Sequence, residues 1–117
     1  MVLFLGPLYS GKHAAAEAYA AEQGLFLTDL RVFEHAEALC FEDDRAAESF
    51  SAEKLNELAD ALAMYDLVLM TEVGGGLVPV DPVERAARED AGRLSILLAE
   101  RADKVYRVFC GIAKQLK

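Results

Sequence analysis

The chain has few basic residues, few cysteines and no long hydrophobic run. Only 12 Lys and Arg stand against 20 Asp and Glu, for a formal net charge of -8. Nucleic acid is therefore not an expected partner, because binding to it depends on cations that meet phosphates. The two cysteines are far apart and form no metal or disulfide motif, so we expect reduced thiols. No apolar run is long enough to span a membrane and none follows a basic leader, so we expect no membrane contact and a cytoplasmic location.

What is present suits one small globular domain. The chain has 117 residues, of which 54% are hydrophobic, and it shows no internal repeat or low-complexity linker. A chain of this length has room for one core. We therefore expect residues 1–117 to form a single domain.

A glycine-rich loop follows the first apolar run. Residues 2–5 are typical of a buried strand, and residues 13–22 are rich in helix-forming residues. A strand, a glycine loop and a helix in this order are the context of a phosphate-binding P-loop. Its glycines let successive backbone N–H groups face phosphate oxygens, and its lysine supplies a cation for the outer phosphates. The predicted nucleotide-binding residues are Gly6, Pro7, Leu8, Tyr9, Ser10, Gly11, Lys12 and His13.

The last residue of this phosphate loop (residues 6–13) departs from the usual pattern. A Ser or Thr normally follows the lysine and binds Mg²⁺ through its hydroxyl, but here the residue is His13. Imidazole is a poor ligand for a hard cation that prefers oxygen. The loop predicts ATP or GTP with Mg²⁺ as a possible companion, and the alternative is a plain strand-to-helix turn.

The remaining elements alternate along the chain. Ser51 and Asp81 are predicted helix N-caps, and Pro82 follows Asp81 at the first helical position. Residues 30–41 are ambiguous and are taken as a helix. The predicted strands cover residues 2–5, 25–29, 67–71 and 105–109, and the other predicted helices cover 13–22, 51–64 and 81–101. This alternation predicts an α/β fold like that of P-loop NTPases, a doubly wound, mostly parallel sheet of about four strands with helices on both faces.

Two carboxylates follow predicted strands, Asp29 after the second and Glu72 after the third. Ligands of such sheets lie outside the carboxyl ends of the strands. We therefore expect the phosphate loop, Asp29 and Glu72 to share one cleft. Gly74, Gly75 and Gly76 come directly after Glu72 and form either a substrate-side loop or a tight turn.

Several segments carry a family resemblance. Residues 71–79 run T-E-V-G-G-G-L-V-P and residues 102–106 run A-D-K-V-Y. They resemble the N-E-V-G-x-G-I-V-P and A-D-E-V-Y segments of the bifunctional adenosylcobinamide kinase / adenosylcobinamide-phosphate guanylyltransferase family of cobalamin biosynthesis. The phosphate loop is similar to that family's G-G-x-R-S-G-K-S, and residues 29–32 are similar to its D-C-L-T strand end. Further matches are Arg88, Gly92, Arg93, Gly111, Ile112, Leu116 and Lys117.

The chain also departs from the family pattern. The family carries a histidine that takes up GMP covalently, in a stretch that is missing here between Gly24 and residue 29, and His35 aligns beyond this gap. The other departures are Tyr9 for an arginine, His13 for a serine, Thr71 for an asparagine, and Ser95 and Ile96 for an Asn-Gln pair. An Ile side chain cannot make the hydrogen bonds of a Gln. The guanylyltransferase step is therefore predicted to be lost.

The resemblance implies a divergent, truncated family member that binds ATP or GTP and takes a corrinoid substrate. In this hypothesis Lys12 contacts the β- and γ-phosphates, and Asp29 and Glu72 hold Mg²⁺ or its waters. Alternatively, Asp29 caps the next helix and Glu72 fixes the glycine loop. The family also implies a homo-oligomer. Two other functions remain open, a non-catalytic nucleotide-binding or regulatory subunit and a small-molecule kinase with another acceptor.

Overall fold

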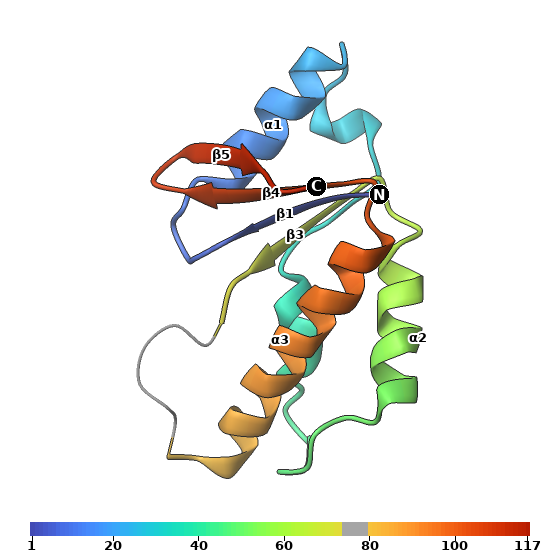
Figure 1. Cartoon of the computed structure of the whole chain (residues 1–117), viewed down its shortest axis with the longest axis vertical. Coiled ribbons are helices and arrows are strands. Elements are labelled where there is room, and N and C mark those ends of the chain that lie inside the picture. The colour runs from blue at the N-terminus through green and yellow to red at the C-terminus, as the bar shows by residue number, and fades with distance from the viewer. Residues whose placement is uncertain (74–79) are drawn as a thin grey trace.

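The computed structural model describes residues 1–73 and 80–117, and in this part of the chain it contains a five-stranded sheet (Figure 1). The strand order is β2-β3-β1-β4-β5. The first four strands in sequence run parallel, and β5 pairs antiparallel with β4. The strands are β1 Val2–Gly6, β2 Val32–Phe33, β3 Leu67–Thr71, β4 Lys104–Phe109 and β5 Ile112–Gln115.

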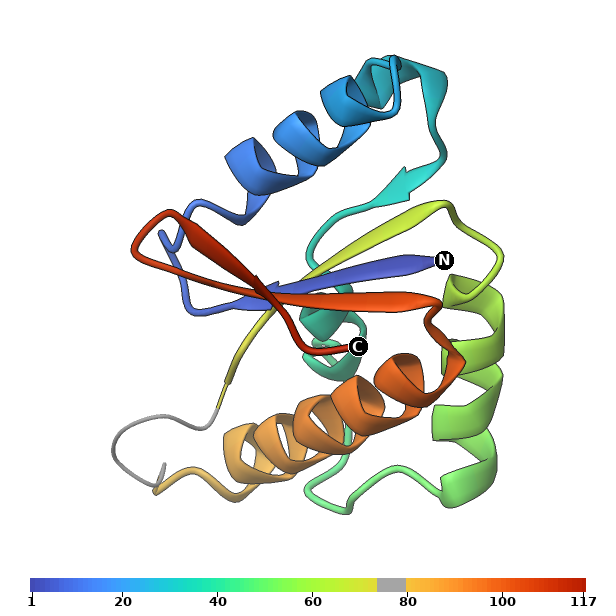
Figure 2. The ribbon, with the colours of Figure 1, turned by 45° about the horizontal axis from the view of Figure 1, so that its top comes forward.

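Helices cover both faces of the sheet (Figure 2). Helix α1 (Lys12–Glu22) lies on one face, whereas α2 (Ala52–Leu62) and α3 (Pro82–Arg101) lie on the other. Two short 3₁₀ helices, η1 (Leu27–Asp29) and η2 (Ala36–Cys40), complete the described elements. The predicted α/β fold with a mostly parallel, doubly wound sheet is confirmed.

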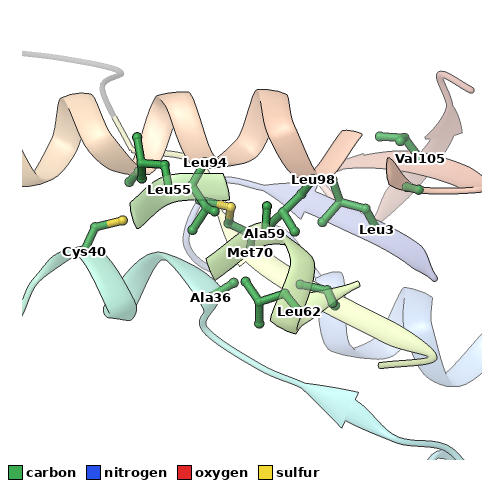
Figure 3. Packing of buried hydrophobic residues seen from close by; sticks show 13 residues of the cluster. Leu3, Ala36, Cys40, Leu55, Ala59, Leu62, Met70, Leu94, Leu98 and Val105 are labelled. Carbon is green, nitrogen blue, oxygen red and sulfur yellow. The ribbon is translucent and has the colours of Figure 1, made fainter. Parts of the chain in front are cut away.

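Alternate residues of β1 supply the two cores, as expected of a strand buried on both faces. Phe4 faces α1, where its ring stacks on Tyr106 at 5.1 Å between centroids and meets Tyr19 edge-on at 5.8 Å. Leu3 faces the other way, into the larger cluster with α2 and α3 (Figure 3). That cluster includes Leu55, Ala59, Leu62, Leu94 and Leu98.

The capping residues in the sequence predicted correctly where α2 and α3 begin. The Ser51 hydroxyl accepts a hydrogen bond from the Lys54 backbone N–H at 3.1 Å, and the Asp81 carboxylate accepts one from Val83 at 3.0 Å. Each bond satisfies a donor that the first helical turn leaves unpaired. Both predicted N-caps are confirmed.

Two predictions between residues 25 and 41 are wrong. The predicted strand at 25–29 is instead η1, because the Asp29 carboxylate accepts a hydrogen bond from the Phe26 backbone N–H at 2.9 Å and closes a tight turn. The predicted helix at 30–41 contains the two-residue strand β2 and then η2. The second strand therefore begins three residues after Asp29, at Val32.

The predicted number of strands was also too low. Strand β5 was missed because all four of its residues are exposed, so it lacks the apolar pattern of a buried strand. It adds an antiparallel edge to the sheet by folding back on β4. Within residues 1–73 and 80–117, no helix has the length and apolar character needed to cross a membrane.

Candidate functional site

The phosphate loop connects the carboxyl end of β1 to the start of α1 and depends on its two glycines. A Cβ at Gly6 would lie 2.4 Å from the Val108 carbonyl oxygen and 2.6 Å from the Ser10 Oγ. Gly11 has φ +92°, a left-handed conformation that favours glycine. Only glycine therefore suits both positions without strain.

Backbone hydrogen bonds brace the loop from both neighbouring strands. The Glu72 N–H, just after β3, donates to the Gly6 carbonyl at 2.9 Å. The Gly111 N–H, in the turn between β4 and β5, donates to the Ser10 carbonyl at 2.8 Å. The loop shape is thus fixed by the chain itself, which is the preorganisation that a phosphate site needs.

A polar atom within the loop lacks a partner. Ser10 is 4% exposed, and its Oγ makes no hydrogen bond to any described residue. Buried hydroxyls are normally paired, so Ser10 needs a partner that the described residues do not supply. The loop borders a cavity of about 270 Å³, whose lining includes Lys12 and His13 on one side and Glu34 and His35 on the other.

Lys12 reaches back over the loop, and its Nζ donates to the Pro7 carbonyl at 3.0 Å. The pKa of Lys12 lies below its ordinary value of 10.5 because burial disfavours the charged ammonium, while the carboxylates of Glu37 and Glu72 act in the opposite direction. The ammonium is therefore partly desolvated and held by one carbonyl. Phosphate oxygens would replace that carbonyl with a stronger, charge-assisted contact.

His13 is held between two carboxylates. Its Nδ1 lies 2.8 Å from Glu34 Oε1, and its Nε2 lies 3.1 Å from Glu17 Oε1. Glu17 is one helical turn further along α1, whereas Glu34 comes directly after β2. The contact to Glu34 links the first turn of α1 to the carboxyl end of a different strand.

Glu72 is held by an arginine. Arg107, on β4, donates through Nε to Glu72 Oε1 at 2.8 Å and through a terminal nitrogen to Oε2 at 3.1 Å. This two-pronged pair raises the pKa of Arg107 above its ordinary value. The pairing is set by the sheet, because Arg107 lies opposite Leu5 and Glu72 bonds to Gly6.

Asp29 does not share the cleft with the other predicted residues. It precedes β2, and β2 pairs with the amino-terminal half of β3, so Asp29 lies at the opposite edge of the sheet from Glu72. Its carboxylate caps η1 rather than facing the loop. The predicted metal pair of Asp29 and Glu72 is therefore not brought together. The carboxylate that follows β2 at the expected edge is Glu34, and His35 beside it lines the cavity.

The arrangement does not suit Mg²⁺ bound in the usual way. The position of the metal-binding hydroxyl is occupied by His13, whose ring nitrogens both contact carboxylates. The Glu72 carboxylate is engaged by Arg107 on both oxygens. Among residues 1–73 and 80–117, no group of three or more His, Cys, Asp or Glu side chains is arranged to hold a metal ion.

A second cavity of about 260 Å³ lies between the end of β3 and the middle of α3. Glu72, Gly92 and Ser95 contribute to its lining. The Ser95 hydroxyl donates to the Gly92 carbonyl at 2.6 Å, while Ile96 is exposed and lies outside this cavity. The predicted substrate loop of Gly74, Gly75 and Gly76 lies outside the described residues.

Sequence reasoning missed Glu34 and Arg107. Glu34 was hidden inside a segment taken as a helix, and the strand end assigned to Asp29 lies four residues later, at Phe33. Arg107 carries no local signal, because an isolated arginine in a strand is ordinary. Only its register opposite Leu5 places it beside the phosphate loop.

Comparison with known proteins gave one family. The family model described as "Cobinamide kinase / cobinamide phosphate guanyltransferase" matches residues 27–116. The matched region begins after the phosphate loop and includes Glu34, Glu72 and Arg107, together with Gly111, which braces the loop. No curated protein matches the chain.

Proposed function

Because the chain belongs to the cobinamide kinase / cobinamide phosphate guanyltransferase family, we propose that it binds the phosphates of ATP or GTP at residues 6–13. Lys12 contacts the outer phosphates, and backbone N–H groups at the start of α1 contact the inner ones. The cavity of about 270 Å³ is near the lower end of ligand pockets, roughly 300 Å³. It suits the phosphates better than a whole nucleotide.

The observation that carries this proposal is the buried, unpaired Ser10 hydroxyl in a loop that has no room for a side chain at residue 6. A plain strand-to-helix turn gains nothing from an unpaired hydroxyl, which costs about 1–3 kcal/mol. A phosphate oxygen seated in the loop would give Ser10 an acceptor. The same oxygen would give the Lys12 ammonium a charged partner in place of the Pro7 carbonyl.

The family points to a corrinoid acceptor, as in cobalamin biosynthesis. We assign the second cavity, between β3 and α3, to the part of the acceptor that receives the phosphoryl group. It is bordered by Glu72 on the side of the phosphate loop and by Gly92 and Ser95 on α3. The homo-oligomer implied by the resemblance remains a prediction.

A second candidate function is a nucleotide-binding subunit without catalysis. The contacts of His13 with Glu17 and Glu34 favour it, because phosphoryl transfer relies on the metal to position and neutralise the phosphates. Binding alone is less demanding. About -4 kcal/mol of binding half-fills a site at roughly millimolar nucleotide.

Calorimetric titration of ATP and of GTP into the wild type and Lys12→Ala tests the proposed site. We expect saturable binding by the wild type and a loss of affinity of about a hundredfold in Lys12→Ala, since a charged contact is removed. Lys114→Ala is the matched control, because Lys114 is an exposed lysine on β5. Equal binding by all three proteins, or by none, would contradict the proposal.

Two further assays separate the candidate functions. Turnover of adenosylcobinamide with ATP or GTP would assign a kinase, whereas Lys12-dependent binding without turnover would assign a non-catalytic subunit. Incubation with labelled GTP followed by denaturation tests the predicted loss of guanylyl transfer. A label retained by the wild type and lost in His35→Ala would overturn that prediction.

A further inference from the structure

We propose that the phosphate loop binds its nucleotide without a divalent cation, because His13 and Arg107 engage the two carboxylates, Glu34 and Glu72, that would otherwise be available to one. This inference rests on the proposed nucleotide binding. It goes beyond it by assigning roles to two side chains that the family resemblance leaves unexplained.

His13 occupies the position at which a metal would meet the loop. A hydroxyl at residue 13 would leave room for a cation beside the Glu34 carboxylate, whereas the imidazole fills that room and contacts Glu34 directly at 2.8 Å. The ring also contacts Glu17, so both of its nitrogens are engaged. A divalent cation placed between residue 13 and Glu34 Oε1 would have to displace the ring.

Arg107 engages the second carboxylate, Glu72, as His13 engages Glu34. Its guanidinium covers both carboxylate oxygens of Glu72, the residue whose backbone N–H braces Gly6. The Arg107 and Glu72 side chains are 52% and 33% exposed, so the guanidinium is open to an incoming anion while it stays paired with Glu72. Guanidinium groups bind phosphate in the same two-pronged manner as carboxylate.

Together these contacts engage both carboxylates beside the phosphate loop. Two carboxylates face the sheet edge, Glu34 and Glu72, and each contacts a basic side chain of the chain itself. Lys12 and the amino terminus of α1 are then free to attract phosphate. In a metal-dependent site the same carboxylates would have to be neutralised by the ion that arrives with the nucleotide.

The first experiment compares nucleotide affinity in EDTA with affinity in millimolar Mg²⁺. For the wild type we expect the two dissociation constants of GTP, and likewise of ATP, to agree within about threefold. An increase in affinity of tenfold or more on adding Mg²⁺ overturns the inference, provided that binding still depends on Lys12. Absence of Lys12-dependent binding in both buffers overturns the proposed function as well.

Two substitutions of His13 sharpen this test. His13→Ala and His13→Ser both remove the imidazole that contacts Glu34 and leave its carboxylate free to repel phosphate, so each should lose affinity in EDTA by about tenfold. Only His13→Ser restores a hydroxyl, so only this variant should regain affinity when Mg²⁺ is added. Unchanged affinity of both variants in EDTA would show that His13 plays no part.

Arg107→Gln tests the part played by the arginine. Its matched control is Lys104→Gln, which changes an exposed residue at the other end of the same strand. We expect Arg107→Gln to weaken nucleotide binding in EDTA by about tenfold and Lys104→Gln to leave it unchanged. Circular dichroism spectra and melting temperatures of all variants establish that they are folded. Equal affinities of the two variants would remove Arg107 from the proposal.

Discussion

Three of the ion pairs in the described part of the chain can be compared: one is buried between α3 and the segment before α2, and two lie beside the phosphate loop. Arg45 and Asp90 have side chains that are 1% and 0% exposed and lie 2.7 Å apart. The His13–Glu34 and Arg107–Glu72 pairs have similar lengths, 2.8 Å each, but all four of their side chains are at least one-third exposed, the least being Glu72 at 33%. Length alone therefore does not distinguish the buried pair from the two exposed pairs.

The partners of the buried pair show what it does. Arg45 also donates to the carbonyls of Cys40, Ala46 and Glu48, and Asp90 accepts from the Phe50 backbone N–H at 3.0 Å. The pair thus fastens the irregular segment between η2 and α2 onto α3. The pairs at the loop lack such a network of backbone partners among the described contacts, which suits the proposed phosphate site.

The largest expected effect comes from Asp90→Asn. It leaves the buried Arg45 guanidinium without a countercharge, so we expect the free energy of unfolding to fall by about 3–5 kcal/mol, measured by urea denaturation. Asp60→Asn is the control, because Asp60 is a largely exposed partner of Arg101 and its loss should cost less than about 1 kcal/mol. Equal effects of the two changes would contradict the distinction between buried and exposed pairs.

Gly6→Ala should have the next largest effect. The added Cβ would meet the backbone carbonyl of Val108, which cannot easily move, so we expect a loss of about 1–3 kcal/mol and of nucleotide binding. Gly92→Ala is the matched control. It lies within α3 with no atom near its added Cβ, so it should stabilise the protein by about 0.5–1 kcal/mol. Stable, nucleotide-binding Gly6→Ala would show that the loop is not the close-packed cradle described above.

Arg107→Gln should change stability least among the ion-pair variants. Its pair with Glu72 is open to water, so we expect the urea midpoint to stay within error of the wild type while nucleotide affinity falls. A clear loss of stability would instead place Arg107 with Arg45 as a structural residue.

The smallest effect concerns the thiols. Burial raises the pKa of Cys40 to about 11 from an ordinary value of 9.0, with a further contribution from Asp90. The folded state therefore holds this proton more tightly than the unfolded state, so stability should fall as the pH rises from about 9 through 11. Cys40→Ala should weaken this dependence of the free energy of unfolding on pH.

The two thiols should also differ in reactivity. At neutral pH one thiol, that of the exposed Cys110, should react with a thiol reagent in the native protein, and both thiols should react after denaturation. Rapid reaction of both in the native state would contradict the burial of Cys40.

The sequence predicted those parts of the fold that carry local signals. The buried strand at residues 2–5, the glycines of the loop and the caps at Ser51 and Asp81 each act on neighbouring residues, and all are found in the structure. Strand β2 has only two residues, and β5 is exposed throughout, so neither has a recognisable pattern.

The charged contacts beside the phosphate loop could not be predicted from the sequence, because each joins residues that are far apart along the chain. Glu34 meets His13 across two elements, and Arg107 meets Glu72 only because β4 lies beside β1. The prediction for Asp29 failed because of a local contact rather than a tertiary one. It follows an apolar run, but its side chain closes a local turn and thereby ends any strand there.

The most direct test of the account is the titration of GTP and ATP into the wild-type chain and Lys12→Ala in EDTA. The account predicts saturable binding by the wild type and affinity about a hundredfold lower for Lys12→Ala, with the wild-type affinity unchanged by Mg²⁺ within about threefold. Binding that is independent of Lys12, or that appears only when Mg²⁺ is added, would contradict it.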